Sequence, residues 1–141
     1  MNTSTLTVLL QIAGLLHVGL LSAGLLMPKV VNLRSHIAVL PDFLRQLFWV
    51  YYMFIGLCLV SFGSLTLTMA STLAGGSPLA RALCVFLCAF WTLRLVAATF
   101  IFDLKPYLTT VHRQLGYHAI NIVFSYLPVV YLLAACKSGT R

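Results

Sequence analysis

Long apolar stretches separated by short polar segments dominate the hydropathy pattern of the chain. Four of them, about residues 5–27, 45–70, 79–102 and 114–136, reach the length of about 20 mostly apolar residues that a helix needs to cross the hydrocarbon core. We therefore predict an all-α integral membrane protein with four transmembrane helices in an up-down-up-down bundle. The intervening segments are too short for an extramembrane domain, so residues 1–141 are expected to form a single membrane domain.

Proline and glycine residues mark the predicted ends of these helices. Pro28 is expected to end the first helix, and Pro41-Asp42 to provide the turn before the second. Gly75-Gly76-Ser77-Pro78 predicts a cap and a first-turn proline for the third. Asp103 to Thr109 are expected to form a short hairpin into the fourth. Pro128 lies inside that last helix, where it frees a carbonyl and is expected to kink the span.

The composition excludes a soluble enzyme. Hydrophobic residues make up 61% of the 141 positions and charged residues only 8%, whereas soluble domains carry roughly a quarter charged residues. The formal charge of +7 comes from basic residues that stand singly beside apolar runs. This pattern is typical of topology signals and lipid-headgroup contacts, so we expect the lipid bilayer as a partner and no nucleic acid.

The distribution of Lys and Arg predicts the orientation in the membrane. The first and third loops with their flanks carry five basic residues, and the opposite side carries three (Lys29, Arg34, Arg45, Lys105 and Arg113 against Arg81, Lys137 and Arg141). Because positive residues favour the cytoplasmic side, loops 28–44 and 103–109 are expected in the cytoplasm of a bacterial inner membrane, with both termini outside. Within the first loop, residues 36–40 are expected either to lie flat at the interface or to dock a partner.

Polar residues inside the apolar spans are the candidates for function, because ionisable groups are costly in a membrane. His118, Asn121 and Ser125 share one face of the fourth helix by their spacing. Folding the hairpins places Arg94 opposite His118, with His17 at a similar depth. We therefore predict a polar layer, and a candidate ligand cluster, made of His17, Tyr51, Arg94, His118, Asn121 and Ser125.

Each of these residues also has a purely structural interpretation. His17, His118 and Asn121 can hydrogen-bond between helices, and Arg94 can extend its side chain towards the headgroups. No catalytic residue is predicted. The spans contain no Asp or Glu away from their ends, which argues against a carboxylate-driven antiporter.

Small and aromatic residues point to packing and anchoring. Gly19-x-x-x-Ala23 predicts a close helix contact, and Gly56 and Gly63 predict the same for the second helix. An aromatic belt is expected on the cytoplasmic side (Trp49, Tyr51, Tyr52 and Tyr107). Cys84 and Cys88 share a helix face and could bind a metal, but buried cysteine more often acts as a small hydrophobe.

Two resemblances accompany these residues. Leu16-His17-Val18-Gly19, in a span that leads into Pro28-Lys29-Val30, resembles the first helix of copper-resistance D-type and related haem-associated membrane domains over about 25 residues. The layout of the segments 48–51, 91–94 and 102–107 is similar to small four-span bacterial membrane proteins without an assigned activity. The second resemblance implies a membrane fold and no particular chemistry.

Three functions remain open at this point. The first is an accessory or scaffold subunit of a larger membrane complex or homo-oligomer, without a cofactor, acting through helix packing and its first loop. The second is a redox protein that binds b-type haem or quinone, with His17 or His118 as the metal ligand and Arg94 beside a propionate or a quinone carbonyl. The third is a small transporter or lipid-handling protein lined by the polar layer.

Overall fold

Four long helices make up most of the protein. The computed structural model describes residues 2–102 and 109–137. In this part of the chain the long helices are α1 (Thr3–Val30), α3 (Asp42–Thr68), α5 (Pro78–Phe100) and α6 (Val111–Cys136), and no strand is present. Each is long and apolar enough to cross a membrane. The predicted all-α fold with four membrane-spanning helices is therefore confirmed.

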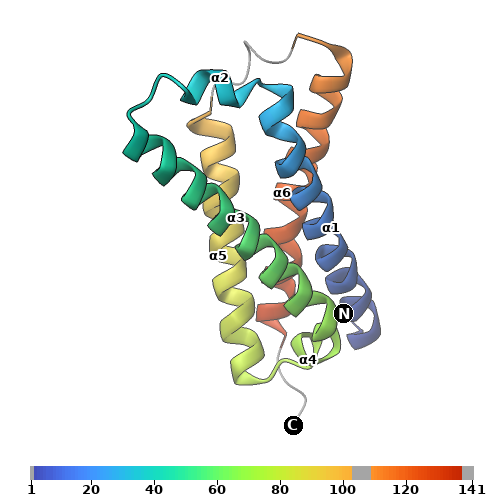
Figure 1. The fold of residues 1–141 in the computed structure, drawn as a ribbon. Helices are drawn as coiled ribbons and strands as arrows, with labels where there is room; N and C mark the ends of the chain where they lie inside the picture. Colours follow the sequence, from blue (N-terminus) through green and yellow to red (C-terminus); the bar gives the residue numbers. More distant parts are fainter. Residues whose placement is uncertain (1, 103–108, 138–141) are drawn as a thin grey trace.

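Two short helices complete the fold. Figure 1 shows α2 (Leu33–Ile37) at one end of the bundle, between the end of α1 and the start of α3, and α4 (Ala70–Ala74) at the other end. The helix α2 therefore includes only residues 36 and 37 of the stretch 36–40, which was expected either to lie flat at the interface or to dock a partner. Its last residue, Ile37, is buried.

The predicted helix limits hold at most ends, with one clear correction at Pro28. The helix α1 continues to Val30 and contains Pro28. A proline at this position cannot donate to the carbonyl four residues earlier, which belongs to Gly24. The hydroxyl of Tyr52 on α3 donates to that Gly24 carbonyl. Because a neighbouring helix satisfies the freed acceptor, the helix can pass through the proline.

The turn before α5 follows the sequence prediction. Gly76 adopts a φ of 72°, a left-handed conformation that glycine tolerates without strain. The Ser77 side chain accepts a hydrogen bond from the backbone N–H of Ala80 at 3.3 Å, and Pro78 is the first helical residue. The predicted cap is confirmed, and Pro128 lies inside α6 as predicted. The predicted hairpin 103–109 falls almost entirely outside the described residues.

Packing is uneven around the bundle. The helix α1 packs against both α3 and α6, and α5 packs against α6. Rings of α3 and α5 meet where Phe62 lies 5.1 Å from Phe90. Figure 1 shows that α3 passes in front of α5 at an angle, and the buried residues that form the core lie mainly on the α4 side of this crossing. The hydrophobic core therefore concentrates in the half of the bundle next to α4.

Glycines allow α1 and α3 to approach closely, at Gly63 of α3 as predicted, but at Gly14 of α1 in place of Gly19. A Cβ on Gly63 would lie 2.8 Å from the Cβ of His17, and one on Gly14 would lie 2.5 Å from Cγ of Leu67. At Gly19 a Cβ would meet nothing within 4 Å. The close contact predicted for Gly19-x-x-x-Ala23 is therefore made one to two turns earlier, because the two helices cross at Gly14 and His17.

Candidate functional site

The most buried polar side chains gather in the centre of the bundle. His17 of α1, Thr66 of α3, Trp91 of α5 and Tyr131 of α6 are each no more than 2% exposed. We call these four residues the central polar cluster. Each long helix contributes one member, so the cluster forms only when all four helices are assembled.

His17 lies between the other rings of the cluster. Its Nδ1 is 2.7 Å from the carbonyl oxygen of Ala13. Since a carbonyl can only accept, Nδ1 carries the proton and donates. The ring centroid of His17 lies 5.1 Å from that of Trp91, in an edge-to-face arrangement, and 6.4 Å from that of Tyr131.

Two nitrogen atoms of the central polar cluster have no hydrogen-bond partner among the described residues. They are Nε2 of His17 and Nε1 of Trp91, both fully shielded from the surface. In contrast, the hydroxyl groups of Thr66 and Tyr131 lie 2.7 Å apart and bond to each other. Buried polar groups are normally paired, so the cluster keeps unused hydrogen-bonding capacity on the His17–Trp91 side.

A small cavity lies beside His17, between α1 and α3. It has a volume of about 190 Å³ and is lined mainly by apolar residues, with His17 and Ser64 as its polar members. Small-molecule sites usually occupy roughly 300–1,000 Å³. This cavity is therefore smaller than a typical cofactor site.

The six residues predicted as a ligand cluster do not come together. Only His17 belongs to the central polar cluster. Tyr51 and His118 are exposed, and Asn121 is half-buried. Ser125 is also exposed and donates to the backbone carbonyl of Asn121 on its own helix. The ring of His118 contacts only its neighbour Tyr117 among the described aromatic residues.

The register between α5 and α6 explains why Arg94 does not meet His118. Trp91 packs on Phe124, and Nε of Arg81 donates to the carbonyl of Ala135. In this register Arg94 lies level with a position on α6 that is about one turn after His118. The guanidinium lies over the rings of Phe124 and Phe102, at 5.3 and 5.5 Å from their centroids. Because Phe102 follows the end of α5, the Arg94 side chain extends towards that end.

His17 and His118 lie at different depths. The ring of His17 contacts Tyr131, and Tyr131 is 13 positions from His118 on the same helix, which corresponds to about 20 Å along the axis. One chain therefore does not place these two histidines on opposite sides of one haem. Among the described residues, no group of three His, Cys, Asp or Glu side chains is arranged to hold a metal ion.

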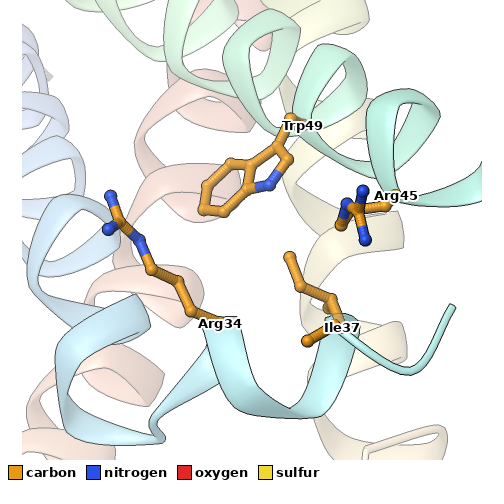
Figure 2. Close-up of a pocket in the computed structure, with 5 residues that line it drawn as sticks. Arg34, Ile37, Arg45 and Trp49 are labelled. Atoms are coloured by element: carbon orange, nitrogen blue, oxygen red, sulfur yellow. The ribbon is translucent and has the colours of Figure 1, made fainter. Parts of the chain in front are cut away.

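A second candidate site lies at the α2 end of the bundle. Figure 2 shows a pocket between α2 and the start of α3, with Arg34 on one side, Arg45 on the other, and Trp49 and Ile37 between them. Its volume is about 360 Å³, and Ala38 completes the lining. We call this the interfacial pocket. Arg45 forms an ion pair with Asp42.

Sequence reasoning missed three members of the central polar cluster and the interfacial pocket. Trp91 and Tyr131 lie well inside their spans, away from the interfacial belt that such residues usually occupy. That position was an available signal that their polar groups face other helices. No pattern in the sequence indicated that Arg34 and Arg45 would lie on opposite sides of one pocket, because this arrangement depends on how the first loop folds.

Comparisons with models of protein families, with curated proteins and with solved structures find no match for this chain. Its four apolar helices fit a multi-pass membrane protein.

Proposed function

We propose that this membrane protein is an accessory or scaffold subunit that holds a partner through its first loop. The observation that carries the proposal is the exposed apolar surface where α2 leads into α3. Val39 is 84% exposed and Phe43 is 70% exposed. Val39 lies in the connection between α2 and α3, and Phe43 lies in the first turn of α3, at the end of the bundle. Exposed apolar side chains that lie together in this way are typical of an interaction surface.

Charge at the same end indicates the chemistry of the partner. Arg34 and Arg45 flank the loop surface, and the whole chain contains only two acidic residues. A partner with apolar side chains surrounded by carboxylates complements such a surface. Helix packing supplies the rigid support, since α1 and α3 meet closely at Gly14 and Gly63.

Purification from native membranes in mild detergent tests this proposal. We expect native mass spectrometry to show the chain with a larger partner at a fixed ratio. The double variant Val39→Ser/Phe43→Ser should lose the partner while its thermal unfolding in detergent stays unchanged. Leu79→Ser is a matched control, because Leu79 is 81% exposed at the opposite end of the bundle.

Two results contradict the proposal. One is a wild-type chain that is free of partners when extracted under these conditions. The other is a partner that the Val39→Ser/Phe43→Ser variant retains in full.

One observation favours a second candidate, a redox protein that binds b-type haem or quinone. With Nδ1 donating to Ala13, the unpartnered Nε2 of His17 is the free position of the ring. A reduced-minus-oxidised spectrum of protein produced with haem supply tests the haem version. Soret and alpha bands that disappear in His17→Gln support it, and a colourless preparation contradicts it.

A further inference from the structure

We propose that the interfacial pocket binds the phosphate group of an anionic membrane lipid. Its residues come from two consecutive elements, α2 and the first turns of α3, which residues 38–41 connect. The proposal goes beyond the proposed function, since it concerns a lipid site and not the protein partner.

The shape of the pocket suits a phosphate group. Figure 2 shows the two arginine side chains on opposite sides of the space, with the ring nitrogen of Trp49 on the side facing Arg45. A guanidinium presents a planar set of N–H donors that matches phosphate oxygens in pairs. Arg45 and the indole N–H of Trp49 face the same part of the space, and Arg34 supplies a second guanidinium to the lining of the pocket.

The charge balance of the pocket leaves it attractive to anions. Arg45 is paired with Asp42, whereas the guanidinium of Arg34 has no ion-pair partner among the described residues. The two arginines therefore exceed the single neighbouring carboxylate by one positive charge.

The surroundings favour a lipid over a free anion. Trp49 packs edge-to-face on Phe48 and Tyr52, with ring centroids 5.8 and 5.6 Å apart. Aromatic residues of this kind concentrate where hydrocarbon meets headgroups. Ile37 and Ala38 add an apolar wall to the pocket. A lipid supplies both the phosphate for the arginines and an apolar portion for these side chains.

A lipid titration of the purified full chain in detergent tests the site. The probes are phosphatidylglycerol and phosphatidylcholine with identical acyl chains, and binding is counted by native mass spectrometry. We expect tighter binding of phosphatidylglycerol. Arg34→Gln should weaken it about fivefold, and Arg34→Gln/Arg45→Gln about 25-fold, from the usual contribution of a basic residue near an anionic surface.

The matched control for Arg34→Gln is Lys137→Gln, which also removes one positive charge, at the other end of the bundle. It should bind phosphatidylglycerol as the wild type does. Trp49 gives an independent readout: lipid should change the fluorescence of the wild type but not of Trp49→Phe, which keeps Trp91 as its only tryptophan. We expect the single variant Arg34→Gln to fold as the wild type does, because the Arg34 side chain is exposed.

Several outcomes overturn the proposal: equal affinity for the two lipids, unchanged binding in both arginine variants, or an equal loss in the control. Displacement of the lipid by millimolar inorganic phosphate would assign the pocket to free phosphate instead. If the Val39→Ser/Phe43→Ser variant loses a protein partner but still binds the lipid, then the lipid site and the proposed subunit function are independent of each other.

Discussion

Individual side chains satisfy backbone carbonyls of neighbouring helices at several points. The hydroxyl of Tyr126 donates to the carbonyl of Leu9 at 3.0 Å, and Nε of Arg81 donates to that of Ala135 at 3.1 Å. Such bonds matter in a membrane, where water does not reach unpaired groups. Against this background, the unpartnered nitrogens of His17 and Trp91 mark the central polar cluster as the place where the core retains hydrogen-bonding capacity.

Gly63 should be sensitive to the smallest possible enlargement. In Gly63→Ala the added methyl would lie 2.8 Å from Cβ of His17, which is fixed to its backbone and cannot rotate away. We expect a loss of about 1–3 kcal/mol in stability, as for other overpacked cores, measured by thermal unfolding in detergent. Gly19→Ala is the control, because its methyl meets nothing within 4 Å; a loss as large there would contradict this account.

The hydrogen bond between Thr66 and Tyr131 should couple α3 to α6. A double-mutant cycle with Thr66→Val and Tyr131→Phe isolates the energy of this buried pair, whose oxygens are 2.7 Å apart. We expect a coupling of about 0.6 kcal/mol and no more than about 1.7, the range measured in membrane proteins. Strict additivity of the two single variants would show that the bond contributes nothing to stability.

Among the four long helices, α3 is the least enclosed by the rest of the protein. It packs closely on α1, meets α5 mainly through rings near Phe62, and leaves much of its α2-side half exposed. In a bilayer that exposed half faces lipid or a partner. Two side chains of other helices donate to carbonyls in the last turns of α1: the hydroxyl of Tyr52 on α3 bonds to Gly24, and the guanidinium of Arg113 on α6 bonds to Val30.

Removing that hydroxyl should loosen the end of α1. In Tyr52→Phe the Gly24 carbonyl, already deprived of its helical donor by Pro28, loses its partner. We expect faster hydrogen exchange in residues 25–30 and a global loss of about 0.5–1.5 kcal/mol. Tyr51→Phe is the matched control, since Tyr51 is 60% exposed. Equal exchange in the two variants would mean that the Tyr52 bond does not hold this segment.

Positive charge is distributed unequally between the two ends of the bundle. Among the described residues, the α2 end carries five Lys and Arg side chains, counting Arg94, which extends towards it, and the α4 end carries two (Lys29, Arg34, Arg45, Arg94 and Arg113 against Arg81 and Lys137). By the positive-inside rule the α2 end should face the cytoplasm.

Cysteine labelling checks this orientation. Cys136 is exposed at the α4 end, so an impermeant maleimide should label it in intact cells. A Ser35→Cys substitution combined with Cys136→Ser should be labelled only after the membrane is permeabilised. The variant Cys136→Ser alone measures labelling of the remaining cysteines. The reverse pattern of labelling would invert the predicted topology.

The sequence alone was sufficient for the fold class and for the approximate position of every long helix. Hydropathy adds up along a local stretch, so a run of apolar residues shows a span without any knowledge of its neighbours. The cap at Ser77-Pro78 and the proline inside α6 were equally local features and were predicted correctly. His17 was singled out for the same reason, as a polar residue in the middle of an apolar run.

Which residues meet depends on how the helices pack against one another. The register of α5 on α6 separates Arg94 from His118, and the crossing of α1 and α3 selects Gly14 and Gly63 over Gly19. The passage of α1 through Pro28 requires a hydroxyl from another helix. Register and crossing points follow from how side chains of two helices interdigitate, a property of the pair that neither segment carries by itself.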